Sequence, residues 1–296
     1  MADKNSYLKF YIIILNWNGL KKTTNCLDSL RLVAYPNYEI VVVDNGSKNQ
    51  EAEILQNKFG DYIHVIKNSV NLGYVGGNNT GLGYALNKRD ADYFLLLNND
   101  TIVEPNLLSA ALEVFKADFE IGLCGPKIKY FGTNKIWWAG AKVYRGTDLF
   151  LRSSWRLTSH LGKRKEDTGQ FDQLSKTDYV TGCALFVRRK VVEAIGLLDN
   201  KFFSYGEDLD WSLRAQQASY KLIYFPFTTV YHVIPLDDNT NKKLGYLLFK
   251  GYHYLKGVIL NLARHYHGNE ILLWGLNLIV LPFCWLYNSL RARFAR

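Results

Sequence analysis

The sequence has few cysteines, and no two of them have the spacing of a metal-binding or CxxC pair. The four cysteines are Cys26, Cys124, Cys183 and Cys284. This spacing gives no indication of a cysteine metal site. Three of them lie in apolar segments, so we expect buried free thiols in a reducing compartment.

The N-terminus lacks the long apolar stretch of a signal peptide, so we expect the folded part to remain in the cytoplasm. Acidic residues are scarce near the other end. From residue 239 onward there are eight Lys or Arg and one acid, Glu270, so this segment carries +7 of the net +9. The first 238 residues are nearly neutral, which does not indicate a nucleic-acid-binding core. A basic tail mixed with apolar and aromatic residues favours contact with anionic lipid.

The chain has 296 residues, enough for one large domain or one domain with an appendage. Aromatic residues make up 15%, a high share that includes 20 Tyr and 7 Trp. This suits sugar stacking or a membrane-interface surface, and an aromatic-rich core is the simpler alternative.

Short apolar runs alternate with helix-like segments in the first hundred residues. The runs cover residues 10–15, 39–43, 63–66 and 93–97, and the helix-like segments cover 20–30, 50–59 and 81–86. This order predicts an α/β domain with a mostly parallel central sheet. Further along, we expect sheet at 121–143 and 179–188, a polar excursion or flexible loop at 142–178, and a helix at 207–217.

Polar residues follow three of these runs at the point where each strand ends. They are Asn16 and Asn18 after the first run, Asp44 and Asn45 after the second, and Asn98, Asn99 and Asp100 after the fourth. Open α/β sheets bind ligands beyond the carboxyl ends of their strands. Any one ending is compatible with an ordinary turn, but three in the same structural position predict a ligand site.

Six segments in chain order carry a family resemblance. They read ILNWNG, VVVDNGS, NLGYVGGNNTGLGYAL, LLLNNDT, YVTGCALFVRR and FFSYGEDLDWSLR. As a set, spanning residues 11–232, they resemble glycosyltransferase family 2, and within it the rhamnosyltransferase-like branch. The resemblance implies a GT-A-type nucleotide-sugar-binding domain over residues 1–238. Its donor half would cover about 1–120 and its acceptor half about 121–238, followed by a membrane-association segment at 239–296.

The first two segments resemble the family's pocket for the donor nucleotide. The resemblance implies that Asp44 bonds the base or ribose, beside Asn16, Asn18 and Asn45. A carboxylate only accepts hydrogen bonds, so it suits the imide N–H of uracil or thymine, or a ribose hydroxyl. The alternative for Asp44 is an Asx-turn.

The third segment matches the family at Asn71, Gly73, Gly77 and Asn78. Glycines before a helix start allow backbone N–H groups to approach a diphosphate closely. The segment lacks the GK[ST] ending of a P-loop.

LLLNNDT takes the place of the family's acidic metal-binding motif, although here only Asp100 is acidic. One or two carboxylates together with phosphates and water suffice for Mg²⁺ or Mn²⁺. The resemblance implies that Asp100 and His232 are the metal ligands, with Asn98 and Asn99 beside them. A structural histidine is the alternative for His232.

The last two segments resemble the acceptor side of the family. The resemblance makes Asp208 the general base, with Glu207, Arg214, Thr181 and Gly182 in contact with substrate. The alternative for the acidic residues is stabilisation of a helix N-terminus.

The tail predicts an amphipathic helix at 245–266 and a 17-residue uncharged segment at 271–287. The second is marginal for crossing a bilayer, so we expect an in-plane or re-entrant contact at the cytoplasmic face, peripheral or monotopic. A buried helical hairpin against the preceding domain is the alternative.

The resemblance predicts an inverting transferase that uses a dTDP- or UDP-sugar, with dTDP-rhamnose preferred, and a lipid-linked saccharide acceptor in polysaccharide or O-antigen synthesis. A catalytically inactive subunit that binds carbohydrate or nucleotide sugar is the alternative. A nucleotidyltransferase would need a basic, Gly-rich loop after the first strand, which is missing. The donor sugar, the acceptor, the linkage and the oligomeric state stay open.

Overall fold

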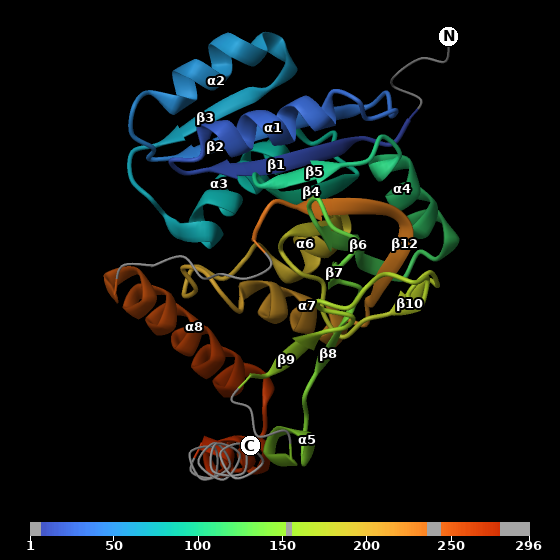
Figure 1. The fold of residues 1–296 in the computed structure, drawn as a ribbon, viewed down its shortest axis with the longest axis vertical. Coiled ribbons are helices and arrows are strands. Elements are labelled where there is room, and N and C mark those ends of the chain that lie inside the picture. Colours follow the sequence, from blue (N-terminus) through green and yellow to red (C-terminus); the bar gives the residue numbers. More distant parts are fainter. Residues whose placement is uncertain (1–6, 152–155, 236–243, 279–296) are drawn as a thin grey trace, which may run out of the picture.

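The computed structural model describes residues 7–151, 156–235 and 244–278. Within these ranges, ten strands form one mixed sheet in the order β10-β12-β6-β11-β4-β1-β2-β3, with β5 beside β12 and β7 beside β6. Helices cover the sheet, and the N-terminal helices lie at the opposite end of the molecule from the C-terminal ones (Figure 1). The described cysteines, Cys26, Cys124 and Cys183, are buried free thiols as expected, and Cys284 lies outside the described residues.

The first part of the chain, which the resemblance assigns to the donor, forms a parallel sheet. Its strands are β1 (Phe10–Asn16), β2 (Tyr38–Asn45), β3 (His64–Asn68) and β4 (Tyr93–Asn98), connected by α1 (Leu20–Leu30), α2 (Glu51–Phe59), the short η2 (Gly60–Tyr62) and α3 (Gly73–Lys88). Strand β1 lies between β2 and β4, and both pairings are parallel. The loops that leave β1 and β4 therefore face a topological switch point, where such sheets form their ligand crevice.

Helix α3 begins at Gly73, eight residues before the predicted helix. Glycine disfavours helix interiors, which is why the sequence pattern hides this start. The glycines are there for packing: a Cβ on Gly77 would lie 2.2 Å from Leu15 Cδ1, and one on Gly81 would lie 2.4 Å from Ile13 Cγ2. Close contact of the helix with β1 therefore outweighs local propensity.

The part of the chain that the resemblance assigns to the acceptor adds antiparallel strands, which make the sheet mixed, although β6 and β12 run in the same direction as the first four strands. It comprises β5 (Thr101–Val103), α4 (Leu107–Ala117), β6 (Ile121–Tyr130), β7 (Ile136–Trp138), β11 (Ala184–Arg188), α6 (Arg189–Ile195), α7 (Glu207–Gln217) and β12 (Lys221–His232). Strand β11 runs antiparallel to both β4 and β6. The polar loop before β11 is consequently placed beside the carboxyl end of β4.

The polar excursion has secondary structure of its own. It contains β8 (Ala141–Val143), α5 (Asp148–Leu151), β9 (Thr158–His160) and β10 (Ser175–Lys176). Strands β8 and β9 form a hairpin, and β10 extends the main sheet at β12. The buried Asp167 carboxylate binds Lys127 at 3.0 Å and Lys129 at 2.6 Å, which fixes the excursion on β6.

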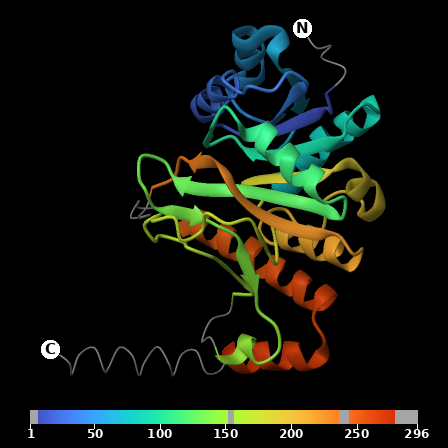
Figure 2. The same ribbon diagram turned by 90° about the vertical axis from the view of Figure 1, so that its right-hand side faces the viewer.

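The tail forms α8 (Leu244–His265) and a further helix over residues 268–278. Helix α7 lies between the sheet and α8 (Figure 2). The second half of α8 packs on the domain, whereas its first half is exposed on several sides. We call the exposed large apolar side chains of α8 its outer face: Leu244, Tyr246, Leu247, Leu248, Phe249, Tyr252, Leu255 and Ile259. Over the described part of the chain, no helix combines the length and the apolar character needed to span a bilayer. Residues 279–287 of the expected apolar segment lie outside the described residues.

Candidate active site

Asn16 and Asp44 meet at the carboxyl ends of β1 and β2. The buried Asn16 donates through Nδ2 to Asp44 Oδ1 at 2.8 Å and to Glu51 Oε2 at 2.9 Å. The backbone N–H of Ser47, three residues on, donates to Asp44 Oδ2 at 3.2 Å, so Asp44 closes its own turn, although not the Asx-turn considered above, which would bond the residue two positions on. Each carboxylate oxygen can accept more than one hydrogen bond, so the turn leaves room for a ligand donor. Asn16 fixes the orientation of the Asp44 carboxylate.

The loops after β1 and β2 are joined through Asn18. Its backbone N–H donates to Ser47 Oγ at 2.9 Å, and its Oδ1 accepts from the Lys48 N–H at 2.9 Å. Glu51 completes the junction by accepting the Gly19 N–H at 2.9 Å. Sequence analysis missed Glu51 because an acid in the first turn of a helix is an ordinary feature.

Asn45 connects β2 to the loop before α3. Its Nδ2 donates to Asn71 Oδ1 and to the Gly73 carbonyl, both at 3.0 Å, and its Oδ1 accepts the Leu72 N–H at 3.1 Å. The Gly73 N–H is itself bonded to Asn71 Oδ1 at 2.8 Å. Asn45, Asn71 and Gly73 therefore shape the turn that begins α3.

Gly77 and Asn78 were expected in a loop before a helix, and this expectation needs correction. Both lie inside α3, where backbone N–H groups beyond the first turn bond helix carbonyls. The buried Asn78 donates through Nδ2 to the Tyr74 carbonyl at 2.8 Å. Gly77 allows contact with Leu15, so packing explains these two positions.

Asp100 and His232 lie together, 132 residues apart in the chain. His232 Nε2 is 3.1 Å from Asp100 Oδ1, and Lys22 Nζ is 3.2 Å from Asp100 Oδ2. Burial opposes ionisation of Asp100, but the hydrogen bond and charge of His232, with the charge of Lys22, outweigh burial and hold its pKa below the ordinary value. Asp100 is therefore a carboxylate at neutral pH.

A carboxylate beside an imidazole fits Mn²⁺, which accepts both oxygen and imidazole nitrogen ligands. His232 is buried, and its Nδ1 has no hydrogen-bond partner. Among the described residues, no three His, Cys, Asp or Glu side chains gather as a metal-binding cluster. The protein would thus supply two ligands, and phosphate oxygens and water would supply the rest.

The two asparagines before Asp100 support this loop. Asn99 Nδ2 donates to Thr23 Oγ1 at 2.8 Å, and Thr23 in turn donates to Asn16 Oδ1 at 2.6 Å. The Asn98 carbonyl accepts from Thr101 Oγ1 at 2.7 Å. A continuous chain of hydrogen bonds therefore joins the loops after β1 and β4.

Asp208 reaches the same region from α7. Its Oδ2 accepts the Gly182 N–H at 3.1 Å, and its Oδ1 accepts the Leu209 N–H at 2.9 Å. Gly182 lies in the loop before β11, whose Cys183 carbonyl accepts the Asn98 N–H at 3.0 Å. A single loop, including the buried Thr181, thus separates Asp208 from the strand end that carries Asp100.

Burial raises the pKa of both Glu207 and Asp208, and repulsion from Asp208 raises that of Glu207 further. Backbone N–H donors oppose the shift at Asp208, whereas Glu207 Oε2 is buried without a partner. Tyr74, which sequence analysis missed, donates to the Gly182 carbonyl at 2.6 Å and lies close to both carboxyls. Glu207 therefore holds a proton more readily than its neighbour.

Arg214 was expected to contact substrate, but the structure places its guanidinium inside the protein. Its Nε donates to Asp210 Oδ2 at 2.8 Å, and its two terminal nitrogens donate to the carbonyls of Ile195 and Leu197 at 2.5 and 2.9 Å. Residues four positions apart share a helix face, so Arg214 pairs with Asp210 on the side of α7 that faces the carbonyls of Ile195 and Leu197.

Trp137 lies between two histidines beside the Asp100–His232 pair. Its ring centroid is 4.7 Å from that of His232 and 4.8 Å from that of His160, both edge to face. Burial, with the charge of Lys163, lowers the pKa of His160 to about 3, so His160 is neutral. Sequence analysis missed His160 because it lies in the polar excursion, where no pattern marked it.

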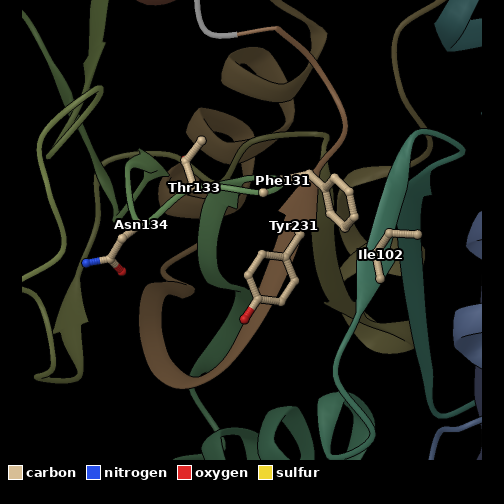
Figure 3. Close-up of a pocket in the computed structure, with 6 residues that line it drawn as sticks. Ile102, Phe131, Thr133, Asn134 and Tyr231 are labelled. Atoms are coloured by element: carbon tan, nitrogen blue, oxygen red, sulfur yellow. The ribbon is translucent and has the colours of Figure 1, made fainter.

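Two hollows flank these residues. The first, of about 470 Å³, is lined by Ile102, Phe131, Gly132, Thr133, Asn134 and Tyr231 (Figure 3). Consecutive residues of a strand face opposite sides of the sheet, so Tyr231 places this hollow on the other side of β12 from His232. The second, of about 680 Å³, lies between α3 and α8 and includes Gly76, Phe203, Tyr252 and Lys256.

Comparison with known proteins relates this arrangement to a family. The model for glycosyl transferase family 2 matches residues 11–196, more than half of the chain. Two proteins of Haloferax volcanii are similar over most of the chain. The low-salt glycan biosynthesis hexosyltransferase Agl10 is 27% identical over 227 residues, which cover 77% of this chain and 68% of that protein. Glycosyltransferase AglE is 24% identical over 218 residues, covering 72% and 63%.

Solved structures show the same fold at low identity. GalNAc-T7, solved with UDP, GalNAc and Mn²⁺, has a TM-score of 0.61 at 16% identity and covers 80% of this chain. The mannosyltransferase PcManGT of Pyrobaculum calidifontis, solved with GDP-Man and Mn²⁺, has a TM-score of 0.57 at 13% identity and covers 94%. This chain spans only 45% of the GalNAc-T7 chain and 71% of the PcManGT chain. The curled, mixed α/β sheet is thus a GT-A fold.

Proposed function

The chain belongs to glycosyl transferase family 2, and we propose that it is a metal-dependent, inverting transferase that moves a sugar from a nucleotide to a lipid-linked saccharide. One observation carries the proposal. The loop of residues 181–183 joins the strand end bearing Asp100 and His232 to Asp208, through the Asn98–Cys183 and Gly182–Asp208 hydrogen bonds. Ligands for a diphosphate-bound cation and a proton acceptor thus share one edge of the sheet.

The donor nucleotide lies over the loops after β1 and β2. Asp44 accepts the imide N–H of uracil or thymine, or a ribose hydroxyl, in the orientation that Asn16 imposes. Asn18 and Asn45 hold the loops on either side of this carboxylate. Preorganisation of this kind reduces the entropy lost on binding.

Asp100 and His232 would hold the divalent cation, Mn²⁺ or Mg²⁺, that the donor diphosphate requires. When bound, the cation supplies positive charge that offsets the charge developing on the leaving nucleoside diphosphate. Lys22, paired with Asp100 in this structure, would add a further positive charge beside the same phosphates. The Mn²⁺ in the structures of GalNAc-T7 and PcManGT supports this assignment.

Asp208 takes the proton of the acceptor hydroxyl. The hydroxyl oxygen bonds to the anomeric carbon as the bond from that carbon to the diphosphate breaks, and the electron pair leaves with the nucleoside diphosphate. This single displacement inverts the anomeric configuration. Burial raises the pKa of Asp208, which makes it a stronger base than a solvated aspartate.

The preferred donor is dTDP-rhamnose, from the sequence resemblance, and the reaction belongs to polysaccharide or O-antigen assembly. The exposed outer face of α8, with Lys250 and Lys256 on the same helix, supports docking at the cytoplasmic face of a membrane. A lipid-linked acceptor would be presented at that surface.

A subunit that binds nucleotide sugar without turnover is the second candidate. It is favoured by the single acid in the metal motif and by the pairing of Asp100 with Lys22 in place of a second carboxylate. The two candidates differ in whether the donor is consumed.

The deciding experiment measures release of nucleoside diphosphate from a panel of sugar nucleotides, with Mn²⁺, Mg²⁺ or EDTA and with membrane lipid extract as acceptor. The variants are Asp100→Ala and Asp208→Asn, with Asp61→Asn as an exposed control. Metal-dependent turnover of one donor that both site variants lose and the control retains supports the transferase. Binding without turnover supports the second candidate, and absence of binding to every donor contradicts both.

A further inference from the structure

The turn that precedes the Glu207–Asp208 pair is held in an unfavourable backbone conformation. Tyr205 has φ 71° and Gly206 has φ 90°, both in the left-handed region. Glycine adopts this region freely, whereas a tyrosine there is strained and keeps that conformation only where surrounding contacts enforce it. The contacts that enforce it come from the C-terminal helix α8.

Asn261 of α8 binds this turn directly. Its Nδ2 donates to the Gly206 carbonyl at 2.9 Å and to the Gly257 carbonyl at 2.9 Å. Asn261 is 1% exposed, so water does not compete for these bonds. One turn earlier on the helix, Gly257 allows α8 to pack closely against the turn, because a Cβ at this position would lie 2.1 Å from the Tyr205 carbonyl oxygen.

A second contact fixes α8 to the helix that the turn begins. The fully buried Asp210 accepts from Arg264 Nη1 at 2.6 Å and from His265 Nε2 at 2.8 Å, in addition to Arg214 of its own helix. Arg264 also pairs with Asp199. Helix α8 is therefore attached to α7 immediately after the carboxylates as well as immediately before them.

Among the described residues, the Asp208 carboxylate accepts one hydrogen bond from outside its own helix, that of the Gly182 N–H. The position of the Asp208 carboxylate therefore depends on the backbone of residues 205–207, which is held by Asn261 and Gly257 of α8. We propose that Asn261 is a positioning residue for sugar transfer, which sets the Asp208 carboxylate against the acceptor hydroxyl through the backbone of Gly206. This inference rests on the proposed function, since it takes Asp208 as the base.

The chain provides a matched control for the loss of a buried asparagine. Asn277, in the helix over residues 268–278, is also 1% exposed, and its Nδ2 donates to the Leu149 carbonyl at 2.8 Å. It has the same side chain, burial and type of bond, but it contacts α5 and not the turn. A purely structural role predicts similar effects for Asn261→Ala and Asn277→Ala.

The experiment measures kcat and the donor KM for Asn261→Ala, Asn277→Ala and Gly257→Ala, with hydrogen exchange of residues 205–209 in the same proteins. We expect Asn261→Ala to lower kcat at least tenfold with donor KM within twofold of wild type, and to speed exchange in this segment. Gly257→Ala should do the same, because it displaces the Tyr205 carbonyl while raising helix propensity. Asn277→Ala should leave kcat and exchange unchanged.

Equal kcat for Asn261→Ala and Asn277→Ala would overturn the proposal, as would unchanged exchange in residues 205–209. A parallel change in kcat and donor KM would also overturn it, since that pattern means general loss of the site. If wild type turns over no donor, the proposed function fails. Exchange alone then decides whether α8 holds the turn.

Discussion

His232 Nε2 lies 3.1 Å from Asp100 Oδ1, and the pairing of two strands places it there. Strand β12 runs antiparallel to β5, so that His232 stands opposite Thr101, the residue after Asp100. The Val233 N–H also donates to the Asp100 carbonyl at 2.8 Å, which fixes the backbones on both sides of the side-chain contact. The pair is therefore set by sheet register.

His232→Gln is expected to weaken Mn²⁺ binding about tenfold or more in the presence of UDP or dTDP, because one nitrogen ligand is lost. Isothermal titration calorimetry measures this, with EDTA-treated protein as the starting state. His64→Gln, an exposed histidine stacked on Tyr84, is the control. Equal Mn²⁺ affinity in the two variants would remove His232 from the metal site.

Glu207→Gln is expected to raise the Tm relative to wild type more at pH 9 than at pH 5. Burial and the nearby Asp208 raise the pKa of Glu207 above its ordinary value of 4.5. Between the ordinary pKa of 4.5, which applies in the unfolded chain, and the raised pKa of the folded protein, the folded state binds more protons than the unfolded state. The stability of the wild type therefore falls as the pH rises through this range. Glutamine resembles the protonated form and escapes this loss.

The Tm gain of Glu207→Gln over wild type should be larger at pH 9 than at pH 5 by an amount on the order of a few degrees, measured by thermal unfolding at both pH values. The exposed Glu113→Gln should show no such widening. A constant Tm difference between pH 5 and pH 9 for Glu207→Gln would mean that Glu207 is not held protonated.

Two glycines of α3 are expected to respond oppositely to alanine. Gly77→Ala places a Cβ 2.2 Å from Leu15 Cδ1, and such overpacking costs about 1–3 kcal/mol. Gly83→Ala meets nothing within 4 Å and should stabilise by roughly 0.5–1 kcal/mol through helix propensity. Denaturant unfolding compares them, and stabilisation by both changes would show that α3 does not pack tightly on β1.

Loss of apolar area from the outer face of α8 is expected to weaken membrane binding. The double variant Leu248→Ser, Tyr252→Ser should bind phosphatidylglycerol vesicles about a hundredfold less well or worse, since each of the two buried side chains contributes roughly 1.5–3 kcal/mol. The control is Leu32→Ser, Phe119→Ser, at positions exposed elsewhere on the domain. Vesicle co-sedimentation that does not distinguish the two would contradict the proposed membrane contact.

Hydrophobic pattern predicted the bounds of several strands and helices closely. Helices α1 and α7 begin and end at the predicted residues, and β1 and β4 differ by a single residue at their ends. These segments have clear periodicity, and their apolar faces are buried as the pattern requires. The start of α3 was missed because five glycines hide a helix that is stabilised by contact with β1.

For the candidate site, the sequence predicted which strand ends carry polar groups but not what each group contacts. Asn16 and Asn45 hold other loops in place, Arg214 turns into the protein, and Glu51, Tyr74 and His160 had no pattern to mark them. Such contacts depend on where a side chain points after packing, which residue spacing does not encode.

The sequence by itself determined the α/β order, the edge of the sheet where the polar candidate residues lie and the family to which the motifs belong, because local periodicity and strand endings are properties of neighbouring residues. The tertiary structure showed the contact of His232 with Asp100 that the resemblance implied, and it alone decided that the sheet is mixed and that Asn261 of the tail supports the turn before Asp208. Each of these joins residues distant in the chain, and their contact is fixed only by strand register and helix packing across the whole fold.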